Sequence, residues 1–133
     1  MSSNKSRILI IEDDPSVRSI LQARLSGKDG HDVLLAEDGE SGLRQAEKEK
    51  VDLIILDWMM PGLNGFETLK ALKNDEQTLN IPVFMLTGKK VMDDIERAFE
   101  AGADGYFTKP IRINELSKRV LVVLNNIEHG SGA

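Results

Sequence analysis

The sequence contains no cysteine, and this absence excludes several kinds of chemistry at once. Without thiols the chain has no disulfide framework, no thiolate nucleophile and no zinc–thiolate site. Long apolar stretches are also missing, because the longest runs, such as Ile8–Ile11 and Leu53–Leu56, are far too short to cross a bilayer. The first six residues lack the apolar core of a signal peptide, so we expect a cytoplasmic protein without a membrane partner.

The chain also lacks an excess of positive charge. Its 17 basic residues are outnumbered by 22 acidic residues, which gives a net charge of −5. A domain of this charge is poorly suited to grip a nucleic acid by itself, so we expect no direct nucleic-acid partner, although an attached segment could bind DNA. With 133 residues, the chain is long enough for one well-buried core and too short for two.

Five short apolar segments alternate with five segments of helical character. Three of the apolar segments are almost continuously apolar, as in strands that are buried on both faces of a parallel sheet. The expected strands are Arg7–Ile11, Val33–Ala36, Asp52–Leu56, Val83–Leu86 and Gly105–Thr108. This alternation predicts an α/β fold with a doubly wound, five-stranded parallel sheet and five helices, because each right-handed crossover lays its helix on one face of the sheet.

Capping and turn residues mark the boundaries of the first helix. Asp14 followed by Pro15 is typical of an N-cap and the first helical position, and Gly27 or Gly30 would end this helix. Small and polar residues at both termini indicate frayed ends. We expect a disordered N-terminus over residues 1–6, a single domain over residues 7–127 and a flexible tail over residues 128–133.

Polar side chains follow four of the five expected strands at their carboxyl ends, where doubly wound sheets bind ligands. These are Glu12 and Asp13 after the first strand, Asp57 after the third, Thr87 after the fourth and Lys109 after the fifth. Two carboxylates about 4 Å apart repel each other by about 4 kcal/mol at an effective dielectric of about 20. The acidic cluster therefore either protonates in part or holds a cation, and oxygen ligands with open positions favour Mg²⁺.

The remaining polar groups of this edge suit a phosphoryl group. Lys109 can pair with one phosphoryl oxygen, and Thr87 can donate a hydrogen bond to another. A carboxylate in these surroundings, such as that of Asp57, is equipped to accept a phosphoryl group. Asp14 is better explained as the N-cap of the first helix, so we leave it outside the ligand set.

From about Arg7 to Ile127, the chain resembles the receiver domain of two-component response regulators. Four motifs carry this resemblance in the order and spacing of the family. They are ILIIEDDP at residues 8–15, DWMMPG at 57–62, LTG at 86–88 and GADGYFTKP at 102–110. The resemblance implies a flavodoxin-like sheet with strand order 2-1-3-4-5. Departures are few: Gly88 replaces the commoner alanine, and the Gly27–Gly30 connection is about one residue longer than usual.

The resemblance also implies a phosphorylated metal site. Asp57 would accept the phosphoryl group from a sensor histidine kinase or a phosphotransfer protein. Asp13 and Asp57 would bind Mg²⁺ directly, together with the backbone carbonyl of Met59, and Glu12 would act mainly through water. Mn²⁺ is a possible substitute. Such a domain is not an enzyme, although slow Mg²⁺-dependent autophosphorylation from small phosphodonors and autodephosphorylation are expected.

Further roles follow from the same resemblance. Lys109 would bind the phosphoryl group and precede a cis peptide bond to Pro110. Thr87 and Tyr106 would form the switch pair, with the output surface on the fourth helix, fifth strand and fifth helix. Met59 and Lys89, two residues beyond Asp57 and Thr87, would flank the path of the hydrolytic water and lengthen the phosphorylated lifetime.

Assembly and the downstream target are less determined by the sequence. Asp104 and Arg119 could lie on the output surface, where some receivers dimerise through ion pairs, but exposed pairs contribute little individually. We expect a monomer, or a weak dimer that tightens on phosphorylation. The cognate kinase, the target and the length of the whole protein stay open.

The main alternative function is a Mg²⁺-dependent phosphatase or phosphotransferase with an aspartate nucleophile. Enzymes similar to the haloacid dehalogenase superfamily usually carry a second aspartate two residues after the nucleophile, and here that residue is Met59. A P-loop is absent, and carboxylates rather than glycines follow the first strand, which argues against a nucleotide hydrolase and a dinucleotide-binding domain. A degenerate receiver that serves only as a scaffold would have lost acidic or lysine positions, and none is lost.

Overall fold

The computed structural model of the protein describes residues 5–59, 64–88 and 92–130, with side chains up to residue 127. Strands and helices alternate along this chain as the sequence predicts. In chain order the elements are β1 Arg7–Ile11, α1 Pro15–Gln22, the π-helix η1 Ala23–Lys28, β2 Asp32–Ala36, α2 Gly39–Lys48, β3 Leu53–Asp57, α3 Gly65–Lys73, β4 Val83–Thr87, α4 Met92–Glu100, β5 Gly105–Thr108 and α5 Ile113–Gly130.

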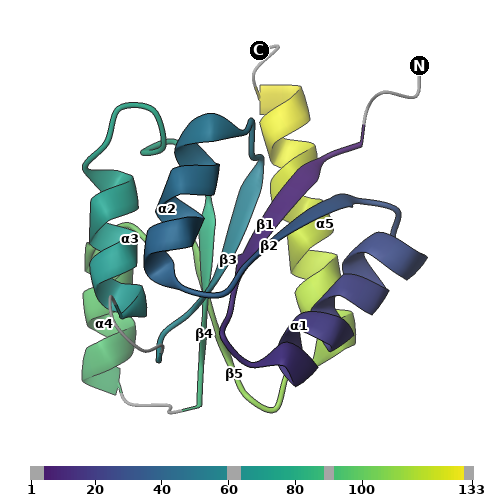
Figure 1. Ribbon diagram of the computed structural model, residues 1–133, viewed down its shortest axis with the longest axis horizontal. Coiled ribbons are helices and arrows are strands. Elements are labelled where there is room, and N and C mark those ends of the chain that lie inside the picture. The colour runs from purple at the N-terminus through teal and green to yellow at the C-terminus, as the bar shows by residue number, and fades with distance from the viewer. Residues whose placement is uncertain (1–4, 60–63, 89–91, 131–133) are drawn as a thin grey trace.

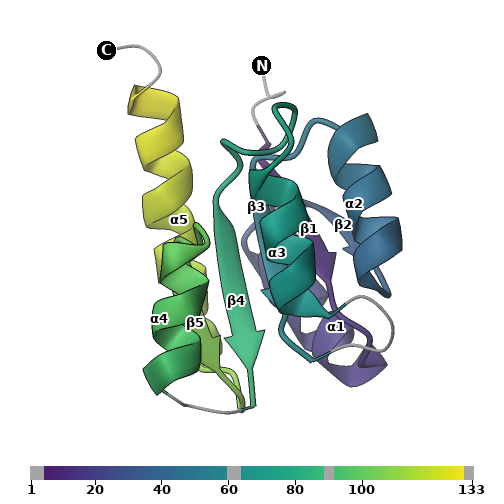
Figure 2. The ribbon, with the colours of Figure 1, turned by 90° about the vertical axis from the view of Figure 1, so that its left-hand side faces the viewer.

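All four strand pairings of the sheet are parallel, and the strand order is β2-β1-β3-β4-β5. This order confirms the predicted doubly wound sheet. Helices α2, α3 and α4 cover one face, and α1 and α5 cover the other (Figure 1). Figure 2 shows the first of these faces, with α2 and α3 in front of the sheet.

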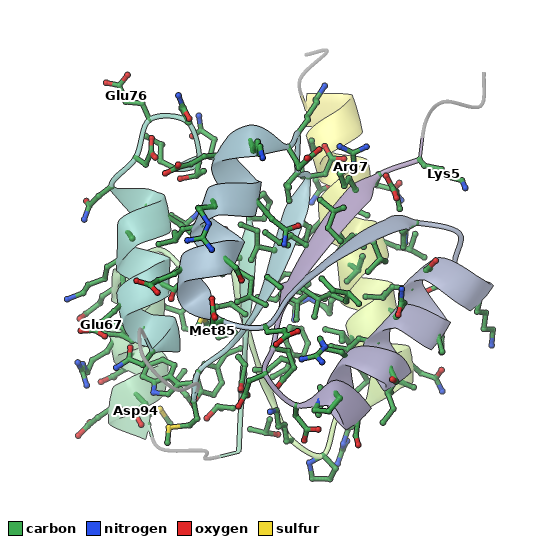
Figure 3. All side chains as sticks on the ribbon, in the orientation of Figure 1. Lys5, Arg7, Glu67, Glu76, Met85 and Asp94 are labelled. Carbon is green, nitrogen blue, oxygen red and sulfur yellow. The ribbon has the colours of Figure 1, made fainter. Side chains whose placement is uncertain are left out.

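The sheet separates two hydrophobic cores. Successive residues of a strand point to opposite faces, so Leu9 and Ile11 pack beneath α2–α4, whereas Ile8 and Ile10 pack beneath α1 and α5. Every residue of β3 and β4 is buried, which explains why the sequence of these segments is almost continuously apolar. Figure 3 shows Met85 of β4 inside this packing, while Arg7 lies at the amino end of β1.

The first helix confirms its predicted start and differs at its end. The side chain of Asp14 accepts a hydrogen bond from the Ser16 N–H, and Pro15 occupies the first helical position. The chain then winds into η1, where the Asp29 N–H donates to the Arg24 carbonyl five residues earlier at 2.8 Å. Because a π-helix uses i→i+5 bonds, it accommodates the longer connection that the sequence shows. Gly30, with φ of 80°, then redirects the chain toward β2.

Three strands and one helix extend beyond their expected bounds. Strand β2 begins at Asp32, one residue before its expected start. Strands β3 and β4 include Asp57 and Thr87 as their last residues, so these side chains are held by the sheet itself. Helix α5 continues to Gly130, three residues past the expected domain boundary. Among the helices of the described ranges, none has the length and apolar character needed to cross a bilayer.

Candidate functional site

Parallel pairing brings the predicted site residues together at the carboxyl edge of the sheet. Ile11 pairs with Leu56, so the next residues of these neighbouring strands, Glu12 and Asp57, lie side by side. One carboxylate oxygen from each of Glu12, Asp13 and Asp57 lies within 4.8 Å of the other two. The structure thus brings together two carboxylates from the loop after β1 and one from the end of β3, as the sequence predicts.

Lys109 completes the cluster from the end of β5. Its Nζ lies 3.1 Å from Asp57 Oδ1 and 3.2 Å from Glu12 Oε1. The Lys109 backbone N–H donates to the carbonyl of Thr87 at 2.7 Å, which anchors the loop to β4. The peptide bond between Lys109 and Pro110 is cis, as the resemblance implied.

Burial makes the carboxyl groups of Glu12 and Asp57 unlike ordinary surface acids. Glu12 has no exposed surface, and Asp57 is 2% exposed. Burial raises the pKa of Glu12 to about 7, and the nearby charge of Asp57 adds to this, while Lys109 and the Asp14 N–H oppose it. Burial likewise raises the pKa of Asp57, against the attraction of Lys109. Burial alone would lower the pKa of Lys109, but Asp57 and Glu12 outweigh it and raise that pKa.

These features fit a hard divalent cation. Among the described residues, Glu12 Oε1 is a buried oxygen that accepts no hydrogen bond, even though Lys109 lies nearby. A buried oxygen of this kind normally has a partner, and a carboxylate-bound cation would supply one. Carboxylate oxygens are the ligands that Mg²⁺ prefers. Among the described residues, the carboxylates of Glu12, Asp13 and Asp57 lie close enough together to hold such an ion.

The two predicted switch residues are already in contact. Thr87 is 2% exposed, and Tyr106 of β5 is half-buried. Burial raises the pKa of Tyr106 and a hydrogen bond with Thr87 opposes this shift, while Asp94 reinforces it. The Tyr106 ring also meets the Trp58 ring edge-on at a centroid distance of 6.5 Å. Tyr106 therefore connects the end of β4 with the residue that follows Asp57.

The sequence singles out four further residues in addition to this cluster. Met59 is largely exposed beside the site, and Lys89 lies outside the described residues. Asp104 and Arg119 line the same pocket of about 340 Å³ beside Tyr106, which puts both on the expected output surface. Asp104 also accepts a hydrogen bond from the Val83 N–H at 2.9 Å.

Two groups of contacts near the site were not predicted from the sequence. Arg18 of α1 donates to the backbone carbonyls of Glu12 and Asp13, at 2.8 and 3.1 Å. The Trp58 ring packs against Phe66 of α3 at 5.4 Å, and the Arg97 guanidinium of α4 lies 4.5 Å from the Phe66 ring centre. The position of Arg18 could have been found from its spacing, because side chains on a first helical turn lean back toward the preceding loop.

The sequence matches one protein family, described as "Response regulator receiver domain", over residues 8–121. The alkaline phosphatase synthesis transcriptional regulatory protein PhoP of Bacillus subtilis is 43% identical over 122 residues, which cover 92% of this chain and 50% of that protein. The phosphate regulon transcriptional regulatory protein PhoB of Escherichia coli is 40% identical, covering 91% of this chain and 52% of that protein. The chain spans about half the length of these curated relatives.

Solved structures show the same architecture. The chemotaxis protein CheY4 of Vibrio cholerae superposes with a TM-score of 0.84 and 31% identity, covering 90% of this chain and 98% of that one. The receiver domain of the sensor histidine kinase PA1611 of Pseudomonas aeruginosa superposes with a TM-score of 0.82 and 27% identity, covering 91% and 98%. That structure contains a magnesium ion coordinated in its active-site cleft. Over most of its length, the present chain therefore belongs to the response regulator receiver domain family, whose members are the phosphoryl-accepting switches of two-component systems.

Proposed function

We propose that Asp57 is the phosphoryl acceptor of this receiver domain. The observation that carries the proposal is the position of its carboxyl group, buried at the end of β3 and paired with Lys109 at 3.1 Å. A carboxylate oxygen of Asp57 would attack the phosphorus of a phosphohistidine on a kinase or phosphotransfer protein. The bond from phosphorus to that histidine breaks, and an aspartyl phosphate forms on Asp57.

Lys109 and Thr87 would bind the transferred group. The Lys109 ammonium now pairs with two carboxyl groups. After the transfer it would pair with one phosphoryl oxygen, and the Thr87 hydroxyl would donate a hydrogen bond to another phosphoryl oxygen. Asp13, Asp57, the Met59 carbonyl and, through water, Glu12 would hold Mg²⁺, with Mn²⁺ as a substitute. When bound, this cation supplies positive charge that offsets the charge of the phosphoryl group.

The output of the switch would pass through Tyr106. A new hydrogen bond from Thr87 to the phosphoryl group would compete with its present bond to Tyr106. The ring of Tyr106 would then shift, together with the surface formed by α4, β5 and α5. To be useful, phosphorylation must favour the active state by a few kcal/mol, which corresponds to a population shift of about a hundredfold or more.

A second candidate function, a Mg²⁺-dependent phosphatase or phosphotransferase, has less support. Its usual general acid would occupy position 59, and the exposed thioether of Met59 cannot transfer a proton. We therefore expect only slow self-catalysed gain and loss of the phosphoryl group. A cytoplasmic location and the absence of direct nucleic-acid contacts remain predictions from the sequence.

The proposal is tested by phosphorylation with acetyl phosphate and Mg²⁺. We expect intact-mass analysis to show one added phosphoryl group, which Asp57→Asn abolishes and EDTA prevents. The exposed residue Asp93 of α4 offers a matched control, because Asp93→Asn makes the same chemical change away from the site and should leave phosphorylation intact. Radiolabelled ATP alone should leave the protein unlabelled. A wild-type protein that accepts no phosphoryl group from acetyl phosphate or from a histidine kinase would refute the proposal.

A further inference from the structure

Two hydrogen bonds donated by backbone N–H groups hold the loop that carries Glu12 and Asp13. The Glu12 N–H donates to the Ala36 carbonyl at 3.0 Å, and the Asp14 N–H donates to Glu12 Oε2 at 3.1 Å. These bonds provide acceptors for two backbone N–H groups of the loop. The two carbonyl groups of Glu12 and Asp13 depend instead on one side chain, that of Arg18.

Arg18 is well placed for this contact. Its backbone N–H donates to the Asp14 carbonyl at 3.0 Å, which makes Arg18 part of the first hydrogen-bonded turn of α1. From there its side chain leans toward the helix N-terminus, and Nη1 bridges the two carbonyl oxygens at 2.8 and 3.1 Å. Both distances are those of good N–H···O bonds.

We propose that Arg18 is a positioning residue of the phosphorylation site: its guanidinium group fixes the backbone of Glu12 and Asp13 and thereby sets the affinity of the carboxylate cluster for a divalent cation. The proposal rests on the proposed function, since it assigns this cluster to a cation. Fixing a loop costs conformational entropy. Arg18 orders the loop before the cation arrives, so less entropy is lost when the cation binds.

The positive charge of Arg18 acts in the opposite direction, because it repels a cation. The geometry indicates that positioning outweighs this charge. Within the described residues, Arg18 donates its side-chain hydrogen bonds to the carbonyls of Glu12 and Asp13, and it forms no ion pair with a carboxylate. Arg18 therefore acts on the cluster mainly through the backbone that it binds.

The test is a Mg²⁺ titration without any phosphodonor, followed by the fluorescence of Trp58, which is adjacent to Asp57. We expect Arg18→Ala to weaken Mg²⁺ binding about tenfold, as is typical when a group that orients metal ligands is removed. Arg18→Lys should lose less, because the ammonium still carries N–H donors, but its shorter side chain and stronger hydration hold the two carbonyls less firmly. The rise in melting temperature on adding Mg²⁺ should shrink in the same order.

Arg24 provides a matched control from the same helical segment. It pairs with Asp29 at 3.1 Å and donates to Asn114 at 2.6 Å, away from the acidic loop. Arg24→Ala removes the same charge and should leave Mg²⁺ affinity unchanged. In acetyl phosphate reactions, Arg18→Ala should raise the Mg²⁺ concentration for half-maximal rate, while the maximal rate stays within about twofold of wild type, as expected for lost binding alone.

Wild-type Mg²⁺ affinity in Arg18→Ala would overturn the inference, as would an equal loss in Arg24→Ala. If Arg18→Ala does not fold in EDTA, Arg18→Lys and Arg18→Gln decide by the same titration. A wild-type protein that binds Mg²⁺ but accepts no phosphoryl group would refute the proposed function alone, since the affinities of the variants would still report on Arg18.

Discussion

Glu12 holds a carboxyl group without exposed surface next to the nearly buried carboxyl group of Asp57. Lys109 supplies one positive charge to both. Without a bound cation, burial and, to a smaller extent, the charge of Asp57 raise the pKa of Glu12 to about 7, so the folded protein keeps a proton on Glu12. In an unfolded chain the side chain of Glu12 is solvated, so it releases its proton near the ordinary glutamate pKa of 4.5.

The stability of the metal-free protein should therefore fall as the pH rises from about 4.5 to about 7. In this range the folded state binds more protons than the unfolded state, which makes the pH slope of the unfolding free energy negative. Glu12→Gln removes the titrating group, so in EDTA at pH 8 we expect it to be more stable than wild type by about 1 to 3 kcal/mol. Urea unfolding at pH 5 and pH 8 measures the difference.

The exposed residue Glu96 of α4 serves as the control, because Glu96→Gln makes the same change far from the cluster and should leave the pH dependence of wild type. Adding Mg²⁺ should stabilise wild type more than Glu12→Gln. Equal stability of wild type at both pH values in EDTA would contradict the prediction.

The residues at positions 59 and 89 should set the lifetime of the aspartyl phosphate. Met59 offers no strong hydrogen bond to orient a hydrolytic water, and Lys89 has no acceptor for its proton. We expect Met59→Asn combined with Lys89→Glu to shorten the phosphorylated lifetime several-fold without changing the fold. The decay of phosphorylated protein in excess Mg²⁺ after removal of the donor measures this. An unchanged or longer lifetime would show that other residues control access of water.

Helix α3 begins in close contact with the end of strand β3, which carries Asp57. Asn64 and Glu67 form a capping box at its start, and the Gly65 N–H donates to the Trp58 carbonyl at 2.9 Å. A β-carbon at Gly65 would collide with the backbone of Asp57 and Trp58. Gly65 is thus needed for the close approach between α3 and the end of β3, and not for an unusual φ value.

Gly65→Ala should therefore disturb both stability and the site. We expect a loss of about 2 kcal/mol or more in unfolding free energy, since the backbone of two segments must separate, together with weaker Mg²⁺ binding. Gly27→Ala is a suitable control, because a β-carbon at Gly27 has open space and the residue lies in the helical segment η1. It should be neutral or slightly stabilising. Thermal melts of both variants, with a Mg²⁺ titration, test the difference; equal stabilities would contradict it.

The success of sequence analysis differed between elements for physical reasons. The buried strands β3 and β4 were readily predicted, because full burial on both faces requires continuous apolar sequence. The π-helix η1 was not predicted, since its residues also suit an α-helix and only the position of Gly30 shows that an extra residue must be accommodated. The contact of Arg97 with Phe66 was also missed, because it joins two helices that are separate in the sequence.

At the site, the chemistry was easier to predict than the electrostatics. The residue types at four strand ends indicated carboxylates, a hydroxyl and an ammonium, and the sheet order brought them together. The complete burial of Glu12 could not be predicted, because it depends on how the loops after β1 and β5 close over its side chain. The role of Arg18 depends in the same way on the backbone path of the acidic loop.

For the whole molecule, we expect a monomer, or a weak dimer that tightens on phosphorylation. Asp104 is engaged within the chain by Val83 and, at 3.7 Å, by Lys73, and Arg119 lies 5.7 Å from the Phe107 ring centre. An ion pair between Asp104 or Arg119 and a second copy would have to compete with these contacts. Such a pair would therefore contribute little to the stability of a dimer. Light scattering with and without beryllofluoride, a phosphoryl mimic, measures the mass. A tight dimer in both states would contradict the expectation.

The two cores on opposite faces of the sheet have a consequence for how such a domain can diversify. No buried side chain belongs to both cores among the described residues, so a substitution beneath α2–α4 leaves the packing beneath α1 and α5 in place. Each face can then acquire a new partner surface through changes in its own helices and its own half of the strand residues. The acidic cluster, where we propose that phosphorylation takes place, lies at the carboxyl edge of the sheet, which both faces share. Specificity for an upstream and a downstream partner can therefore be altered separately, by substitutions that never touch the chemistry.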